Sequence, residues 1–416
     1  MQVYRIIYWI RYVLVVSLVS ILPNAPVIAE SFIEEVVVTA RKREESALDT
    51  PVSVTVLSGE DIDVYNTRSL VQLTARVPGL AIENGGGGFA GGDMTIRGIG
   101  RTALDYGLDS SVTLWIDGVA FSRGHMTSTG LFDARSVEVQ KGPQSLYYGK
   151  NTIAGVVAIH SVSPVVGEEM EGFLRASYEF ETEDPVFEGG ISFPLGDTLA
   201  VRLAGRYQDM QGGWAENSAQ PLDVSALYPG TNFQTRGAAW EDFPKQEETI
   251  ARATIVWEPS DNFDANLKLF HADTKRADTT ATALWSCADG PGANPFFAVS
   301  FVQFADPTQT CPDESPRLLS NAALPPIEVS RANPFTEDDG EFFYELEQDL
   351  YTLQMNWDLG NYTVTSVTGY WDYESGEQTD YAWTSWATSG LANQGESGES
   401  FTQELRVSSN GDYISK

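Results

Sequence analysis

The feature that most constrains the fold is a regular alternation of apolar and polar side chains in the second half of the chain. Leu199, Val201 and Leu203 alternate with polar residues such as Arg202, and residues 251–257 repeat the pattern. Successive side chains of a β-strand point to opposite faces, so each such segment predicts a strand with one apolar and one polar face. Several segments carry an aromatic residue near one end, as strands at a membrane interface do.

The connections between these segments alternate in length. We expect about eight strands, near residues 172–180, 187–194, 199–210, 247–257, 263–272, 345–358, 362–373 and 400–409. The links after the second, fourth and sixth strands are tight, whereas those after the third, fifth and seventh are long and polar. This alternation collects the long loops on one side, which is typical of outer-membrane barrels. A soluble β-sandwich is the alternative, but it has no reason to place every long loop at one end.

Residues 51–166 predict a compact α+β domain. Residues 52–56 alternate as a strand does, and Ser58 with Asp61 has the signature of a capping box that opens a short helix. Leu70, Leu73 and Val77 would share one face of a second helix. Four strand-like segments follow, at 94–97, 112–116, 137–140 and 156–159, and we expect them to form one sheet.

No motif points to a metal, a nucleotide or catalysis. His125, His160 and His271 lie far apart, and the sequence has no HExxH, CxxC pair or P-loop. Residues 85–92 contain a formal GxGxxG match, but no apolar strand precedes it and strand-like residues follow, so a flexible loop is favoured. We expect neither an enzyme nor a cofactor. The formal net charge of -32 argues against nucleic-acid binding.

Residues 1–29 have the organisation of a secretory signal peptide. Arg5 and Arg11 precede an apolar run that ends at Pro23, and Val27 and Ala29 satisfy the small-residue rule for cleavage. An inner-membrane anchor is the alternative, but the uncharged run is shorter than the roughly 20 residues that span a bilayer. We therefore expect an exported protein.

The segment after the cleavage site predicts an isolated strand. Val36, Val37, Val38 and Thr39 are all β-branched and favour an extended backbone, and a highly charged stretch follows them. Such a strand near a free terminus suits β-augmentation, in which the sheet edge of a partner accepts it. The alternative is that it forms the first strand of the next domain.

Cys287 and Cys311 are the two cysteines of the chain, and both lie in one polar, proline-containing segment. In an oxidising compartment they could close a loop as a disulfide. Two unpaired thiols are the alternative.

An ordered series of motifs resembles the TonB-dependent outer-membrane receptor family. These motifs are 34–43 (EEVVVTARKR), 77–80 (VPGL), 96–100 (IRGIG), 115–119 (WIDGV), 137–151 (VEVQKGPQSLYYGKN), 155–157 (GVV) and 401–407 (FTQELRV). Each motif alone is moderately specific, whereas their order is very specific. The resemblance covers essentially the whole chain.

The resemblance implies an α+β plug domain followed by an all-β antiparallel transmembrane β-barrel. The expected organisation is a signal peptide at 1–29, a TonB box and linker at 30–50, the plug at 51–166 and barrel strands at 167–416. Receptors of this family have about 22 strands around the plug, whereas about eight would close only a narrow barrel. We therefore expect an incomplete barrel, with the chain an N-terminal fragment.

The resemblance also implies a function and partners. In this family TonB binds the TonB box from the periplasm and transmits energy, and a ligand is imported across the Gram-negative outer membrane, whose lipid surrounds the barrel. Ferric siderophore is the expected cargo, with vitamin B12, haem or oligosaccharide as same-fold alternatives. A passive porin or an adhesin is the alternative from another class.

Site residues follow from the matching motifs. The expected TonB-binding residues are Glu34, Glu35, Val36, Val37, Val38, Thr39 and Ala40. The plug-motif residues are Arg97, Gly98, Asp117, Gly118, Glu138, Lys141, Gly142, Pro143, Gly149 and Gly155. We expect the glycines to permit tight turns, and Arg97 and Glu138 to form ion pairs or, alternatively, to carry surface charge. The ligand-binding candidates in outward loops are Arg101, Tyr106, Phe121 and His125.

Overall fold

The computed structural model describes residues 37–39, 42, 45–46, 50–83, 92–100, 110–121, 124–213, 215–217, 221, 223, 225, 229–238, 242–277, 318–320, 324–332, 334, 336, 338–380 and 391–410. The predicted signal peptide, Arg101, Tyr106, Cys287 and Cys311 lie outside these described residues.

The α+β domain is built on a five-stranded mixed sheet. Its strand order is β3 (Ser53–Ser58), β9 (Ala134–Lys141), β10 (Gly155–Ser161), β7 (Val112–Ile116) and β8 (Val119–Phe121). Strands β10 and β7 pair in parallel, and the other neighbours pair antiparallel. All five residues of β7 are buried, as are the first five of β10, because both strands lie inside the sheet and are covered on both faces.

Short helices connect these strands. The first, α2 (Gly59–Val64), starts at the predicted capping box: Ser58 Oγ accepts from Asp61 N at 3.1 Å, and an Asp61 carboxylate oxygen accepts from Ser58 N at 3.0 Å. Two others are η2 (His125–Ser128) and α3 (Ser145–Tyr148). Among the described residues, no helix is both long enough and apolar enough to cross a membrane.

The second predicted helix forms as a 3-10 helix, η1 (Val71–Ala75). Leu70, Leu73 and Val77 are all buried, as their shared face predicted. The amide of Leu73 donates to the carbonyl of Leu70, and that of Arg76 to Leu73, so the turn is tighter than in an α-helix.

One strand of the α+β domain was assigned to the wrong sheet. Residues 94–97 were expected in the main sheet, but β5 (Asp93–Ile96) pairs with β4 (Leu80–Glu83) and β6 (Ile99–Gly100) in a separate three-stranded sheet. The reason is a tight turn after β5, where Arg97 and Gly98 have φ angles of 54° and 77°. This turn reverses the chain, so β5 finds its partners locally.

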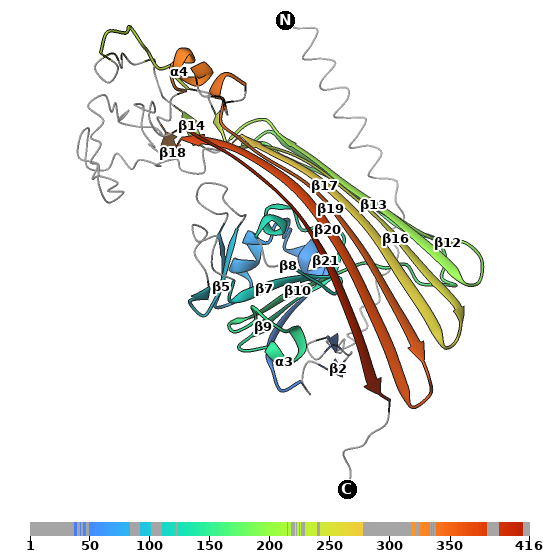
Figure 1. Ribbon diagram of the computed structural model, residues 1–416. Helices are drawn as coiled ribbons and strands as arrows, with labels where there is room; N and C mark the ends of the chain where they lie inside the picture. Colours follow the sequence, from blue (N-terminus) through green and yellow to red (C-terminus); the bar gives the residue numbers. More distant parts are fainter. Residues whose placement is uncertain are drawn as a thin grey trace, which may run out of the picture. The chain divides into compact units, whose positions relative to one another are not determined.

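The second half of the described chain forms one eight-stranded antiparallel sheet, which is strongly curved (Figure 1). Its strands, in order, are β11 (Glu171–Glu179), β12 (Asp184–Pro194), β13 (Leu199–Met210), β16 (Lys245–Ser260), β17 (Phe263–Ala277), β19 (Phe343–Asp358), β20 (Tyr362–Asp380) and β21 (Leu391–Ser409). Every strand pairs with its sequence neighbour in this set. The predicted fold class is confirmed.

The polar faces of these strands, rather than the apolar ones, are buried. Arg202, Thr254 and Lys268 are at most 8% exposed, whereas Leu203 and Trp257 are 48% and 47% exposed. A soluble sheet would bury its apolar face against a core. The inversion matches strands whose apolar side chains face lipid and whose polar side chains face the interior of a barrel.

The connections lie as the sequence predicted, with one addition. Three short turns, at 195–198, 261–262 and 359–361, lie at one end of the sheet. The strand ends that flank the long connections 211–244, 278–342 and 381–390 lie at the other. The first connection, 180–183, is short although it lies at the long-connection end. Below, the two ends are called the short-turn end and the long-connection end.

Two of the long connections associate with each other. Strand β14 (Ala215–Asn217) pairs with β15 (Asp242–Phe243) and with β18 (Leu318–Ser320). The same region holds α4 (Ile327–Ala332) and η3 (Asp338–Gly340). The described parts of connections 211–244 and 278–342 therefore pair with each other at the long-connection end.

Candidate functional site: the interface between the α+β domain and the sheet

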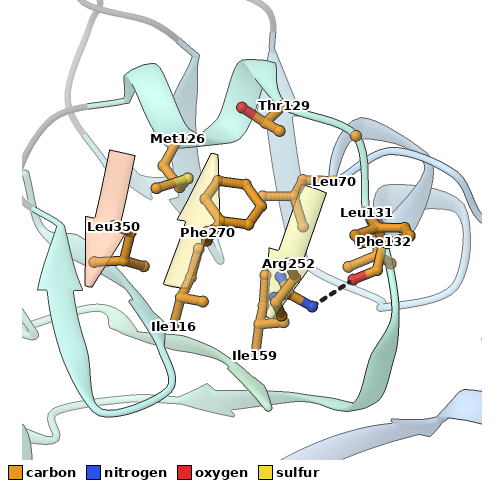
Figure 2. Close-up of a pocket in the computed structure, with 11 residues that line it drawn as sticks. Leu70, Ile116, Met126, Thr129, Leu131, Phe132, Ile159, Arg252, Phe270 and Leu350 are labelled. Atoms are coloured by element: carbon orange, nitrogen blue, oxygen red, sulfur yellow. Dashed lines mark hydrogen bonds between the residues drawn. The ribbon is translucent and has the colours of Figure 1, made fainter. Parts of the chain in front are cut away.

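Buried charges of the α+β domain are paired with charges on the sheet. Arg202 in β13 donates to both carboxylate oxygens of Asp133, with Nη2 2.6 Å from Oδ1 and Nε 3.1 Å from Oδ2. Arg252 in β16 donates from Nη1 to the carbonyl of Phe132 at 3.2 Å, the dashed line in Figure 2. The two-pronged contact of Arg202 and the hydrogen bond of Arg252 together fix the position of the 132–133 segment on the sheet.

A second buried pair joins Asp117, in the turn between β7 and β8, to Lys268 in β17. Lys268 Nζ lies 2.7 Å from Asp117 Oδ1, 2.6 Å from Ser161 Oγ and 3.3 Å from the Ser161 carbonyl, so all three ammonium hydrogens have acceptors. Burial alone would raise the pKa of Asp117, but Lys268 and Arg252 outweigh it and hold this pKa well below its usual value. Asp117 is therefore a buried, ionised carboxylate.

A third contact depends on the absence of a side chain at Gly130. Its amide donates to Glu248 Oε1 at 2.8 Å, and Arg206 Nη1 donates to Glu248 Oε2 at 2.5 Å. Arg206 and Glu248 are both almost fully buried. A Cβ at Gly130 would overlap Arg206 Nη1 and would lie 2.6 Å from Glu248 Oε2.

Replacing Gly130 with Ala is therefore expected to destabilise the protein by about 1–3 kcal/mol, the usual cost of overpacking. The pinned Arg206–Glu248 pair cannot move aside without losing its hydrogen bonds. The matched control is Gly205→Ala, where the nearest atom to an added Cβ is the Ile250 carbonyl oxygen at 3.6 Å. Thermal denaturation in detergent checks this, and equal midpoints for the two variants would contradict it.

Apolar packing surrounds the paired charges toward the long-connection end. Met126 and Leu131 of the α+β domain lie close to Phe270 and Leu350 of the sheet around a cavity of about 30 Å³ (Figure 2). The four side chains belong to one buried cluster shared by the domain and the sheet. A cavity of this size has room for about one water molecule, so this part of the interface is essentially dry.

The predicted TonB-binding segment contacts the α+β domain at Thr39, which follows β1 (Val37–Val38). Thr39 N donates to both carboxylate oxygens of Glu138, at 2.9 and 3.1 Å. Thr39 Oγ1 lies 2.9 Å from His160 Nε2, and the Tyr148 hydroxyl donates to the Thr39 carbonyl at 3.2 Å. Burial lowers the pKa of His160, while Glu138 opposes that shift. Of the other predicted TonB-binding residues, Glu34, Glu35, Val36 and Ala40 lie outside the described residues.

Lys42 extends this contact from the α+β domain to the sheet. Its Nζ lies 3.8 Å from the centroid of the Trp115 ring, within cation–π distance, and 2.8 Å from Glu404 Oε2 in β21. Burial lowers the pKa of Lys42, and Glu404 opposes this effect. Thr39 and Lys42, here called the leader contact, thus bind the domain and the sheet wall together.

The expected ion pairs of Arg97 and Glu138 have different outcomes. Glu138 is buried and holds Thr39, with His160 Nε2 3.5 Å from its carboxylate. Arg97 is exposed, its Nη2 is 3.5 Å from Ser53 Oγ, and it forms no ion pair with any described residue. The ion-pair expectation for Arg97 is therefore wrong within the described chain, because the turn at 97–98 directs this residue to the surface.

The plug-motif glycines all have positive φ angles; four lie in turns or at a helix end, and Gly155 is the first residue of β10. The φ angles are 77° at Gly98, 89° at Gly118, 105° at Gly142, 76° at Gly149 and 154° at Gly155. Gly118 also approaches the sheet, since an added Cβ would lie 3.0 Å from Val367 Cγ1 in β20. Lys141 ends β9, and Pro143 lies between β9 and α3.

The ligand-binding candidates Phe121 and His125 are buried, although they were expected in outward loops with accessible surface. Phe121 packs edge-to-face on Trp371, with ring centroids 5.0 Å apart. His125 packs on Tyr373, and its Nε2 lies 3.2 Å from Glu396 Oε2. Both contacts lie toward the long-connection end of β20 and β21. A ligand-binding role for these residues stays a prediction.

In the described ranges, no group of three or more His, Cys, Asp or Glu side chains is placed to hold a metal ion.

The comparisons with known proteins agree with this architecture. The family described as "TonB-dependent Receptor Plug Domain" matches residues 46–156, which cover most of the α+β domain. Residues 46–156 therefore belong to this plug-domain family, and the antiparallel eight-stranded sheet that follows matches the barrel strands of TonB-dependent receptors. The α+β domain is the plug of this family, and the sheet corresponds to its barrel wall.

Curated relatives are receptors and transporters. A hemin receptor of Yersinia pestis is 33% identical over 227 residues, which are 47% of this chain and 32% of the relative. The vitamin B12 transporter BtuB of Vibrio vulnificus is 28% identical over 180 residues, 43% of this chain and 28% of the relative. A pesticin receptor of Yersinia pestis is 31% identical over 224 residues, which are 53% of this chain and 30% of the relative. The chain spans less than a third of the length of these relatives.

Solved structures share the fold. The ferric yersiniabactin uptake receptor FyuA from Yersinia pestis matches with a TM-score of 0.62 and 19% identity, covering 87% of this chain and 46% of that chain. The siderophore receptor PiuA from Acinetobacter baumannii matches with a TM-score of 0.60 and 18% identity, and the match covers 89% of this chain and 44% of that chain. At this identity the likeness concerns the fold alone.

Sequence reasoning missed most of the residues that join the plug to the sheet. Asp133, Gly130 and Lys42 were not singled out, and Lys268 was recognised only as a polar residue of a predicted strand. The available signal was that Lys268 lies on the polar face of a predicted strand, which indicates that its side chain points toward the interior of the barrel. It does not indicate which plug residue the side chain meets.

Proposed function

We propose that this chain is part of an outer-membrane receptor that binds a scarce nutrient at the cell surface and imports it into the periplasm with energy transmitted by TonB. The observation that carries the proposal is the plug, held against the polar face of the sheet by buried pairs such as Asp133–Arg202 and Asp117–Lys268. A plug held this firmly closes the interior to passive flow. Import past it therefore requires energy.

The leader contact supports the coupling to TonB. Thr39 belongs to the segment that resembles a TonB box, and its main chain is held by the side chains of Glu138 and Tyr148. A partner that adds this segment to its own sheet edge would pull on Glu138 in β9 through Thr39. Force applied to the leader therefore reaches the central sheet of the plug directly.

The apolar outer face of the sheet supports the proposed location. Leu174, Leu203, Phe401 and Leu405 are each between 48% and 84% exposed. Exposed apolar side chains in this number are unfavourable in water and suit contact with lipid hydrocarbon. We place the sheet in the outer membrane of a Gram-negative cell, with the short-turn end toward the periplasm.

Ferric siderophore is the cargo that we propose first. The names of the relatives add haem and vitamin B12 as candidates, since one is called a hemin receptor and another a vitamin B12 transporter. An oligosaccharide remains a same-fold alternative. A labelled form of each compound, supplied to cells that express the receptor, separates these candidates.

The proposed function is tested by collapsing the proton gradient with a protonophore during an uptake assay. Labelled ligand should still bind to the cell surface, while its accumulation in the periplasm should stop. Accumulation that continues unchanged would indicate a passive porin, the alternative from another class. Surface binding with no accumulation before or after treatment would indicate an adhesin.

A further inference from the structure

A second cavity lies between the plug and the sheet, at the short-turn end. Its volume is about 470 Å³, which is in the range of small-molecule sites. Thr39 and Lys42 of the leader contact line it, together with Trp115 and Arg135 of the plug and Arg406 of β21. The leader, the plug and the sheet therefore all border one cavity.

Two buried nitrogen atoms that line this cavity have no hydrogen-bond partner among the described residues. They are Nε1 of Trp115, a residue that is 9% exposed, and Nε of Arg406. Both groups can donate a hydrogen bond and neither can accept one. Because buried polar atoms are nearly always hydrogen-bonded, these two donors call for an acceptor that the described residues do not supply.

Positive charge is in excess around these donors. Glu404 is shared by two cations, since Lys42 Nζ lies 2.8 Å from its Oε2 and Arg406 Nη1 lies 2.7 Å from its Oε1. Lys42 Nζ also lies 3.8 Å from the centroid of the Trp115 ring, so both donors belong to residues that adjoin this pair of charges. Burial lowers the pKa of Lys42, and the neighbouring charge of Arg406 lowers it further. An acceptor that carries negative charge would balance this excess.

Arg135 adds a further cation to the cavity. It is exposed, and it forms no ion pair with any described residue. The buried Asp117–Lys268 pair also lines the cavity, but its two charges cancel. The part of the cavity that the leader borders is therefore cationic, although the whole chain has a formal net charge of -32.

The other acidic groups of the cavity lie across it, beside the short turn 261–262. They are Glu258 in β16 and Asp264 in β17, and Asp264 Oδ2 already accepts from Asn356 Nδ2 at 2.8 Å. The unpartnered acceptor Asn266 Oδ1 is also on β17. Strand β17 is three positions from β21 in the sheet, which places these acceptors roughly 14 Å from Arg406 along the sheet. They do not serve the donors around Lys42.

We propose that this cavity binds a small oxyanion, such as phosphate or a carboxylate, between Lys42 of the leader, Trp115 of the plug and Arg406 of the sheet. An oxyanion offers several acceptor atoms, and its hydrogen bonds to cationic donors are charge-assisted. Such a ligand touches all three parts at once and stabilises the leader contact. The inference goes beyond the proposed import and stands without it, because it concerns binding to the receptor at rest.

The site is tested by equilibrium dialysis of the full-length receptor in detergent, with radiolabelled inorganic phosphate or citrate at constant ionic strength. Trp115→Phe removes the indole donor but keeps an aromatic ring for Lys42, and Arg406→Gln removes the excess charge. Each should weaken binding by about tenfold or more, the usual effect of losing a hydrogen bond to a charged group. The matched control is Lys275→Gln, which removes an exposed cation paired with Glu345 and should leave binding unchanged.

Arg135→Gln is a further variant, and because its side chain is exposed the replacement leaves the core of the plug intact. It should also weaken binding. Phosphate that citrate displaces would identify a site open to carboxylates, and phosphate that citrate does not displace would identify a phosphate site. The proposal is overturned if the parent binds neither probe saturably, if Trp115→Phe and Arg406→Gln bind as the parent does, or if Lys275→Gln loses binding equally.

Trypsin digestion tests whether the anion contacts the leader. Trypsin cleaves after Arg41, Lys42 and Arg43. A ligand that binds only while the leader is in place lowers the fraction of molecules whose leader is released. Phosphate should therefore slow cleavage at residues 41–43 in the parent but not in Arg406→Gln. Cleavage at an unchanged rate in a parent that has bound phosphate would place the anion away from the leader and overturn the proposed bridge.

Discussion

Replacing Lys268 with Met is expected to lower the free energy of unfolding by about 3–5 kcal/mol, the usual cost of leaving one member of a buried ion pair unpaired. Lys268 and Asp117 are at most 10% exposed, and their charged atoms are 2.7 Å apart. Met has a similar length but no charge, so the Asp117 carboxylate would stay buried without its ammonium partner. Its bonds from Ser161 N and Oγ would remain.

The Lys268→Met prediction has two readouts. Thermal denaturation in detergent reports the loss of stability, and the sensitivity of cells to bulky antibiotics reports loosening of the plug. The matched control is the double variant Lys268→Met, Asp117→Asn, in which a neutral amide replaces the unpaired carboxylate and part of the stability should return. A double variant less stable than Lys268→Met alone would show that the buried charge is not the cause.

Deleting residues 34–40 is expected to abolish energised uptake while sparing ligand binding at the cell surface. The deletion removes the segment that we propose TonB binds, including Thr39 and its contacts with Glu138, His160 and Tyr148. It leaves the buried pairs Asp133–Arg202 and Asp117–Lys268 in place, so the plug should stay in position. Labelled ligand would then bind without accumulating in the periplasm.

The control for the deletion is the parent protein after collapse of the proton gradient. If the leader transmits this energy, the deletion and the collapse remove the same step, and applying both should cause no further loss. Thr39→Val is the milder variant, since it keeps the β-branched shape and the backbone bond to Glu138 but removes the hydroxyl. Normal uptake in the deletion variant would refute the role of residues 34–40.

The predictions that held rest on local regularities. Alternating side chains predicted the eight strands, because every second residue of a strand faces the same way. Ser58 and Asp61 predicted the start of α2, because a capping box needs partners only three residues apart. The strand at 93–96 was assigned to the wrong sheet, since its partners depend on the turn at Arg97 and Gly98. The alternation of side chains in a strand does not by itself predict which strand it pairs with.

The contacts that hold the plug could not be predicted in the same way. Lys268 and Asp117 are 151 positions apart in sequence, and Thr39 and Glu138 are 99 apart. Alternation shows that Lys268 faces the polar side of its strand, but many plug residues could meet it there. Which one does so depends on how the domain packs against the sheet.

The sequence by itself determined the strand pattern, the lengths of the connections and the motifs that resemble a TonB box and a plug, because these depend on neighbouring residues. Only the tertiary structure decided which acid pairs with which base, which plug residues meet the sheet, and that Thr39 and Lys42 border a cavity between the plug and the sheet. Those properties arise when the surface of the plug packs against the surface of the sheet. The energy of each contact depends on how deeply it is buried, and the sequence of one segment alone does not specify that burial.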